Sequence, residues 1–390
     1  MKLKCRPEDF RVEERTPRIP DGGAHALYRL TKLALGTPEV IEAVLRRWKI
    51  DRRQVAYGGL KDRHAVTIQH LTIHRGPRRD LKQTNFELAY LGQCSRPFHA
   101  KDIASNAFTI VLRDVGEDES ARAAQALDAV SRDGLPNYFD EQRFGSVGQS
   151  GDFTARVWCT GDYERALWLA LADPNPHDRS QVRRQRTLLR EHWGDWGRLE
   201  PKLRRSPWCD ILTHLVRHPR DFRGAVGRIR QDLRSLYLAA FQSFLWNGML
   251  AELLRARVRA DRLTQVPLAG RPMPFPCGLE PGELEFLRAV ELPLPSARSR
   301  NDLGPWQEIV EPVLAPLGLA LGQLRVKYPR DSFFSKGNRP ALVLPSQLDY
   351  RVDRDELYGG RSKIVLSCEL PRGAYATILT RRIAALGGGS

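Results

Sequence analysis

Both ends of the chain alternate between hydrophobic and polar residues over short stretches, which is the pattern of half-buried β-strands. Near the start, Phe10 and Val12 alternate with charged neighbours in an extended segment, residues 4–14, where Pro7 disfavours helix. Further strands are predicted at residues 26–32, 66–68, 108–112, 341–344 and 363–370. The two ends of the chain are therefore expected to be rich in strands.

Helical periodicity lies between and after these strands. One helix is expected to begin at Thr37, with the Thr37 hydroxyl as its cap and Pro38 as its first helical residue. Further helices are predicted at residues 119–131, 230–257, 307–318 and 374–386, of which 230–257 has the strongest pattern. Pro and Gly in residues 262–299 predict loops, and the polar stretch 349–361 is expected to separate the last two strands.

The character of the chain changes near Phe153, where arginine and tryptophan become frequent and strand signals become few. It changes back near Lys336. We therefore expect an inserted, mostly helical domain. The predicted domains are residues 1–152, 153–336 and 337–386, followed by a flexible GGGS tail at 387–390.

The net charge of +16 and the pI of about 9.9 predict a polyanionic partner, most often nucleic acid. Residues 179–230 contain 13 Arg and one Lys against five acidic residues, which concentrates the excess in one region. Genome composition also produces arginine-rich proteins, and this alternative stays open.

Several classes of protein are disfavoured by what the sequence lacks. No apolar run is long enough to span a membrane, and residues 1–10 lack the apolar core of a secretory signal, so we expect a cytoplasmic protein. The six cysteines are widely separated, without the spacing of metal ligands, and are expected to be free thiols in a reducing compartment. We expect no structural metal.

A loop at residues 57–65 is the first candidate for chemistry. Gly58 and Gly59 permit a turn or a close approach of the backbone, and a β-branched run after the loop predicts a strand. Asp62 lies between Lys61 and Arg63, which are expected to lower the pKa of its carboxyl and keep it ionised. The alternative is an ordinary solvated turn.

Residues 135–148 form a second candidate. Asn137, Tyr138, Phe139, Gln142 and Arg143 place aromatic rings among polar side chains, a combination suited to stacking on RNA bases and bonding their edges. It is equally suited to an aromatic structural loop.

Four separated segments together resemble the TruD family of pseudouridine synthases. They are RPEDFRVEE, GGLKDRHAVTIQ, PNYFDEQRFG and PRGAYAT, at residues 6–14, 58–69, 136–145 and 371–377. Their order and approximate spacing match that family, and the resemblance covers nearly the whole chain, with a weak match at 181–230. It implies an α+β fold, in which a synthase domain with a mixed, largely antiparallel sheet is interrupted by an inserted, mostly helical TruD-specific domain.

The resemblance also assigns residues. Asp62 matches the catalytic aspartate of the family. Phe10, Asn137 and Tyr375 match positions that line the uridine site of the family. Phe139 and Lys4 match positions close to that site. Two departures are Asp140, where the family usually has Gly, and Tyr375, where Phe is commoner. Asn137 is suited to bonding a uracil edge or to holding its loop, and Lys4 either keeps Asp62 ionised or is a solvated lysine.

The implied function is isomerisation of uridine to pseudouridine in tRNA, at uridine 13, by a monomer without cofactor or metal. The inserted domain is expected to clamp RNA through Arg183, Arg184, Arg186, Arg204 and Arg205. Alternatives are an RNA-binding or RNA-folding protein with a vestigial site, and a synthase that acts on other RNA uridines. A metal-dependent nuclease is disfavoured, because the sequence lacks a ligand cluster.

Overall fold

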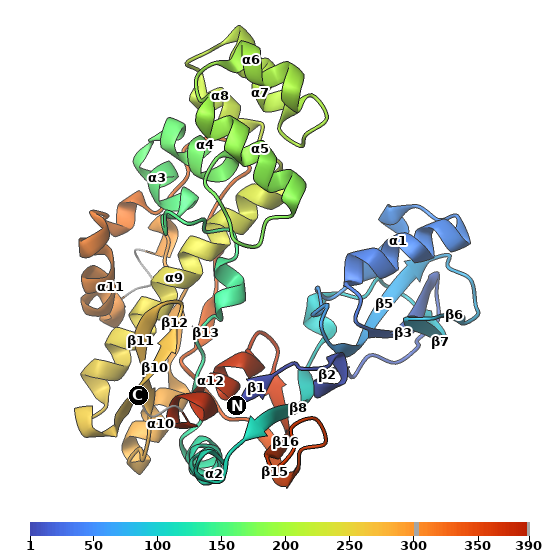
Figure 1. The fold of residues 1–390 in the computed structure, drawn as a ribbon, viewed down its shortest axis with the longest axis vertical. Helices are drawn as coiled ribbons and strands as arrows, with labels where there is room; N and C mark the ends of the chain where they lie inside the picture. The colour runs from blue at the N-terminus through green and yellow to red at the C-terminus, as the bar shows by residue number, and fades with distance from the viewer. Residues whose placement is uncertain (300–303, 388–390) are drawn as a thin grey trace. The chain divides into compact units, whose positions relative to one another are not determined.

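The computed structural model describes residues 1–299 and 304–387 (Figure 1). The chain divides into two compact units, the first formed by Met1–Leu135 together with the residues from Val343 onward, and the second by Pro136–Leu342. Both predicted boundaries, at Phe153 and Lys336, fall inside the second unit. Composition marks where helices become frequent, whereas the preceding segment already packs in the second unit: Asn247 bonds both the N–H and the C=O of Phe139.

The first unit is built on a mixed, largely antiparallel sheet of ten strands among the described residues, which confirms the predicted α+β class. The order is β15-β16-β8-β2-β5-β3-β7-β6, with β1 paired to β8 and β4 to β5. Only β2 and β5 pair in parallel among the described strands of this sheet. The strands are β1 (Lys2–Leu3), β2 (Phe10–Arg15), β3 (His25–Leu33), β4 (Val55–Tyr57), β5 (Val66–His74), β6 (Leu81–Gln83), β7 (Phe86–Cys94), β8 (Ser105–Val115), β15 (Ser346–Arg354) and β16 (Ser362–Pro371).

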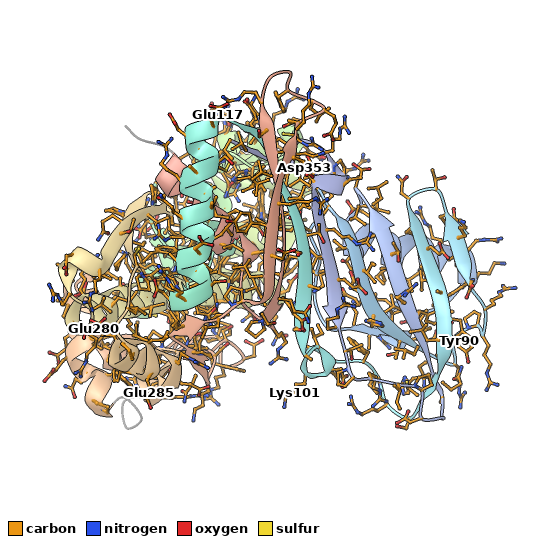
Figure 2. All side chains as sticks on the ribbon, turned by 90° about the horizontal axis from the view of Figure 1, so that it is seen from below. Tyr90, Lys101, Glu117, Glu280, Glu285 and Asp353 are labelled. Atoms are coloured by element: carbon orange, nitrogen blue, oxygen red, sulfur yellow. The ribbon has the colours of Figure 1, made fainter. Side chains whose placement is uncertain are left out.

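Two α-helices of the first unit pack on this sheet, α1 (Thr37–Trp48) and α2 (Glu117–Asp133), and a third, α12 (Ala376–Gly387), packs against α2. Val40, Ile41 and Val44 of α1 are buried in one core with residues of β3, β5 and β7. Figure 2 shows α2, labelled at Glu117, beside strand β15, labelled at Asp353, while Tyr90 marks β7. Helices α1 and α2 thus cover different parts of the same sheet.

Strand β15 corrects one expectation, because it occupies much of the polar stretch 349–361. Its residues are largely exposed, and it lies at the end of the sheet, where it pairs with β16 alone. A charged edge strand needs no apolar face and resists pairing with other chains. Hydrophobic patterning therefore could not show it.

The second unit is organised around α9 (Gln231–Arg257), a helix of 27 residues whose middle is buried on all sides. The unit also contains α3 (Thr154–Thr160), α4 (Tyr163–Leu171), α5 (Ser180–Glu191), α6 (Trp196–Leu203), α7 (Cys209–Arg217), α8 (Phe222–Gly227), α10 (Pro281–Ala289), α11 (Gln307–Leu314), β10 (Leu263–Leu268), β11 (Arg271–Pro276), β12 (Glu291–Pro293) and β13 (Asn338–Pro340). The chain enters this unit through β9 (Leu135–Pro136) and leaves it through β14 (Leu342–Val343).

The loop-rich prediction for residues 262–299 is wrong in part. The antiparallel hairpin β10–β11, the helix α10 and the strand β12 lie there. Pro267 and Pro272 face each other in the hairpin register. Each strand of an isolated hairpin keeps one edge free of ladder bonds, so proline is tolerated there although it signals loops in sequence.

Candidate active site

The loop that carries Asp62 joins β4 to β5 in the first unit, as the glycines and the β-branched run predicted. A side chain at Gly58 would place its Cβ 2.5 Å from Ile103 Cδ1 and 3.3 Å from Ala100 Cα. Gly58 therefore serves the close approach of the backbone. Gly59 has open space around it, and its carbonyl accepts a hydrogen bond of 3.3 Å from Gln69 Nε2.

Thr37 secures the loop from the start of α1. Its hydroxyl accepts a 3.1 Å hydrogen bond from the Lys61 main-chain N–H and donates one of 2.8 Å to Gln69 Oε1. Gly36, not Thr37, is the N-cap of α1, which corrects the predicted capping role. The hydroxyl instead holds the loop beside Asp62.

The neighbours Lys61 and Arg63 do not hold the Asp62 carboxylate, contrary to expectation. Lys61 Nζ lies 3.1 Å from the buried Glu14 carboxylate and donates to Asn106 Oδ1 at 2.6 Å. Arg63 pairs with Glu39 at 3.1 Å. Both side chains therefore anchor the loop to its surroundings.

Lys4 makes the ion pair with Asp62, through Nζ and Oδ2. Lys4 follows β1, with a left-handed φ of 56°, and its ammonium lies 4.3 Å from the centre of the Phe10 ring. Burial by itself would raise the pKa of the Asp62 carboxyl. The hydrogen bond and charge of Lys4 and the His64 main-chain N–H outweigh burial, so the pKa is below its usual value and the group is ionised at neutral pH.

Phe10 and Tyr375 belong to the same unit as Asp62. Phe10, on β2, is buried, with its ring edge-to-face against Phe108 at 6.1 Å and one face beneath the Lys4 ammonium. Tyr375 immediately precedes α12 and is half-buried. The structure thus brings Lys4, Phe10 and Asp62 into one contact group.

Asn137 and Phe139 belong to the second unit, where Arg339 ties them together. The Arg339 guanidinium donates to Asn137 O at 2.8 Å and to Asn137 Oδ1 at 2.6 Å, and it lies 4.1 Å from the centre of the Phe139 ring. Asn137 Nδ2 donates to Pro340 O at 3.0 Å. These contacts show Asn137 holding its loop, and Phe139 is buried against Trp246.

Asp140 has a structural explanation. Its carboxylate caps the short 3₁₀-helix Glu141–Phe144 by accepting a hydrogen bond from the Gln142 main-chain N–H at 3.4 Å. The acidic residue therefore stabilises the turn where the family usually has glycine.

Four of the five candidate RNA-binding arginines are exposed on the second unit: Arg183, Arg184, Arg204 and Arg205. Arg186 differs, because its side chain is mostly buried. Its guanidinium pairs with Asp178 at 2.8 Å and donates to the main-chain carbonyls of Ala170 and Asp173. Arg186 is therefore committed to contacts within its own unit.

Sequence reasoning missed Lys32, Glu14 and Arg339. Lys32 shares a face of β3 with Tyr28 and Leu30, so a lysine in the buried register of a strand was an available signal. Glu14 shares its face of β2 with Phe10 and Val12, which is a similar signal. Nothing in the sequence around Arg339 points to its role.

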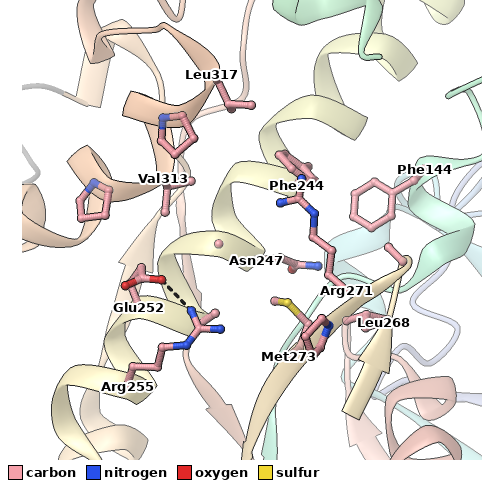
Figure 3. A pocket seen from close by; sticks show the side chains of 16 residues that line it. Phe144, Phe244, Asn247, Glu252, Arg255, Leu268, Arg271, Met273, Val313 and Leu317 are labelled. Carbon is pink, nitrogen blue, oxygen red and sulfur yellow. Dashed lines mark hydrogen bonds and ion pairs between the residues drawn. The ribbon is translucent and has the colours of Figure 1, made fainter. Parts of the chain in front are cut away.

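A separate cavity of about 380 Å³ lies in the second unit, between α9, the β10–β11 hairpin and α11 (Figure 3). Its lining includes Phe244, Met273 and Val313, and a Glu252–Arg255 ion pair of 2.6 Å. None of the predicted site residues lines it. The cavity is therefore distinct from the Asp62 loop, which belongs to the first unit.

No helix within residues 1–299 and 304–387 combines the length and apolar character needed to cross a membrane. All six cysteines are free thiols, three of them buried.

Comparisons with known proteins agree with this architecture. The family model described as tRNA pseudouridine synthase D (TruD) matches residues 1–266. The "Probable tRNA pseudouridine synthase D 2" of Methanocaldococcus jannaschii is 30% identical, over 98% of this chain and 91% of its own length. The tRNA pseudouridine synthase D of Aquifex aeolicus is 26% identical, over 98% of each chain.

A solved structure of a TruD protein from Methanosarcina mazei shares the fold. Its TM-score is 0.72 at 23% identity, and the match covers 98% of this chain and 93% of that one. Together the comparisons identify the fold and the class of enzyme: a pseudouridine synthase, which isomerises uridine. The chain belongs to the TruD family of tRNA pseudouridine synthases, which confirms the resemblance drawn from the sequence motifs.

Proposed function

We propose that this protein isomerises uridine to pseudouridine in tRNA and that Asp62 is its catalytic carboxylate. The observation that carries the proposal is an ionised, partly buried carboxylate on a pinned loop, held by the Lys4 ammonium. Groups with shifted pKa values in such settings are frequent at active sites. Family membership supplies the reaction.

The chemistry needs little beyond such a carboxylate. Isomerisation breaks the N1–C1′ bond, turns the uracil and joins C5 to C1′, so no atoms or electrons enter. Asp62 either attacks C1′ or assists removal of a ribose proton, and both routes require the ionised form. The Lys4 ion pair supports that form at neutral pH.

The other matched residues are proposed to hold the flipped uridine. Unstacking a base costs a few kcal/mol, which an aromatic face such as that of Tyr375 offsets. Phe10 would support Lys4 beside the base, since its ring already lies beneath the ammonium. Asn137 and Phe139 would help to hold the uridine through their loop, which the contacts of Arg339 order.

The substrate and target are proposed from the family. The relatives' names specify tRNA, and the sequence resemblance supports uridine 13, beside the D stem. The exposed arginines of the second unit would bind the phosphate backbone. Free thiols throughout suit a reducing compartment, and we propose a monomer that acts in the cytoplasm.

The test is tritium release from tRNA that carries [5-³H]uridine, because bond formation at C5 displaces the hydrogen. The wild-type protein is expected to release tritium without added metal or cofactor. Mapping pseudouridine in cells that lack the protein then tests the position, with loss at tRNA position 13 alone as the expected result. RNA binding without tritium release would instead indicate a vestigial site, and losses in other RNAs with position 13 intact would refute the target.

A further inference from the structure

Buried polar side chains lie beneath the Asp62 loop and form a floor for it. Thr37, Gln69 and Lys32 are each at most 1% exposed. Lysine is almost never buried to this degree unless its ammonium is fully bonded. Lys32 therefore calls for an explanation that the proposed chemistry does not provide.

The Lys32 ammonium bonds to main-chain carbonyls on both sides of the site. Nζ donates to Leu35 O at 2.6 Å, in the turn between β3 and α1, and to Asp62 O at 2.7 Å. A longer bond of 3.5 Å reaches Lys61 O. An ammonium has three N–H groups, so these carbonyls use its whole donor capacity.

We propose that Lys32 is a positioning residue, whose buried ammonium fixes the main chain of Asp62 to the turn before α1 and so sets the direction of the Asp62 carboxylate. This inference rests on the proposed function of Asp62. Lys32 acts on the peptide carbonyl of Asp62, whereas Lys4 acts on its carboxylate. The two lysines thus constrain different ends of one residue.

The charge on Lys32 is sensitive to pH. Burial lowers its pKa from 10.5 to about 8, although the negative charges of Asp62 and Glu39 oppose this effect and that of Lys61 adds to it. Above about pH 8 the ammonium loses a proton. Its third N–H and its charge are then lost, and the hold on the loop weakens.

Stability and activity should then change in opposite directions. Between about pH 8 and 10.5 the unfolded chain binds a proton at Lys32 that the folded protein does not, so the contribution of Lys32 to stability rises with pH over this window. Positioning of Asp62 deteriorates over the same window. If deprotonation of Lys32 lowers the activity at alkaline pH, unfolding of the protein is therefore not the cause.

The test compares Lys32→Met and Lys32→Gln with the wild-type protein in single-turnover tritium release, tRNA binding and hydrogen exchange of the loop. Lys32→Met is expected to lower the rate by about 100-fold, the loss associated with a displacement of about 1 Å in a reacting group. Exchange of residues 58–65 should become faster, and tRNA affinity should stay within about twofold. Lys82→Met, at an exposed lysine of β6, is the matched control and should change none of these.

Normal turnover in Lys32→Met would overturn the inference. So would slower turnover with unchanged loop exchange. If Lys32→Met does not fold, Lys32→Gln decides: it retains a donor that cannot titrate, so its rate should not fall between about pH 7 and about pH 9, where the wild-type rate should. A fall shared by both proteins would come from a titrating group other than Lys32 and would also overturn the inference. Asp62→Asn separates the two proposals, because its normal turnover would refute the proposed function itself.

Discussion

The Lys4 ammonium contacts the Asp62 carboxylate although 58 positions of sequence separate the two residues. Pairing of β1 and β2 with the same strand, β8, and of β2 with β5 brings the two segments together. The proposed catalytic group thus depends on the register of the sheet for its charge state.

Asp62→Asn is expected to abolish tritium release while tRNA affinity stays within several-fold. Asparagine keeps the size of the side chain but can neither attack C1′ nor accept a proton as a carboxylate does. Asp349→Asn, at an exposed position of β15, is the matched control. Near-normal turnover of Asp62→Asn would remove Asp62 from the mechanism.

Lys4→Met is expected to shift the acid limb of the pH–rate profile to higher pH. Without the ammonium, burial is largely unopposed and raises the pKa of Asp62, so the carboxylate protonates earlier as the pH falls. In the wild-type protein the depressed pKa keeps the rate level until the pH falls below the usual range of an aspartate.

Single-turnover rates between about pH 4 and pH 8 measure this shift. Lys4→Arg preserves the charge and should keep the limb near its wild-type position. An unshifted limb in Lys4→Met would mean that Lys4 does not control the ionisation of Asp62.

Neutralising the exposed arginines should weaken tRNA binding and flatten its salt dependence. The change is Arg183, Arg184, Arg204 and Arg205 to Gln together, and the measurement is the slope of log affinity against log salt. For every phosphate that is no longer neutralised, the magnitude of the slope should fall by about 0.7–0.9. A slope equal to that of the wild type would show that these arginines form a solvated surface.

Arg186→Gln should behave in the opposite way. Its guanidinium is tied to Asp178 and to two main-chain carbonyls, so the substitution should destabilise the second unit by about 2 kcal/mol. The salt slope should stay nearly unchanged. Thermal unfolding and salt titration of the same variant separate these effects. A large decrease in the salt slope would mean that Arg186 binds RNA after all.

Arg339→Lys should impair the second unit while preserving charge. Lysine cannot reproduce the paired donation to Asn137 or the planar contact with Phe139, so we expect a decrease of about 1–3 kcal/mol in unfolding free energy. Asn137→Ala in the Arg339→Lys background should add little, because the two residues act together. Full additivity in this double-mutant cycle would contradict the coupling.

Local patterns predicted five of the ten described strands of the large sheet, the long helix α9 and the loop that carries Asp62; the five strands are β2, β3, β5, β8 and β16. Period-two alternation and the glycine pair are patterns among neighbouring residues, so they can be recognised in a single sequence. The partner of Asp62 was assigned to Lys61 and Arg63 because they are adjacent, but both side chains pair elsewhere. Lys4 and Lys32 reach the loop only through strand pairing, which the sequence does not display.

The edge strand β15 and the hairpin β10–β11 escaped prediction for a related reason. Strand β15 is largely exposed and carries no apolar face, whereas the hairpin contains prolines that signal loops in sequence but are acceptable at unpaired strand edges. The domain boundaries were drawn from composition, whereas compact units follow packing, as the contacts of Asn247 with Phe139 illustrate.

The sheet of the first unit is interrupted in sequence, since β16 comes from the end of the chain and lies between β15 and β8. During synthesis, β8 therefore leaves the ribosome with one edge unpaired while all of Pro136–Leu342 is still being made. Open strand edges attract other chains, and domains emerging from the ribosome tend to fold as units. The second unit can consequently complete its fold before the first, and the nascent chain is most exposed to aggregation or chaperone capture during that interval.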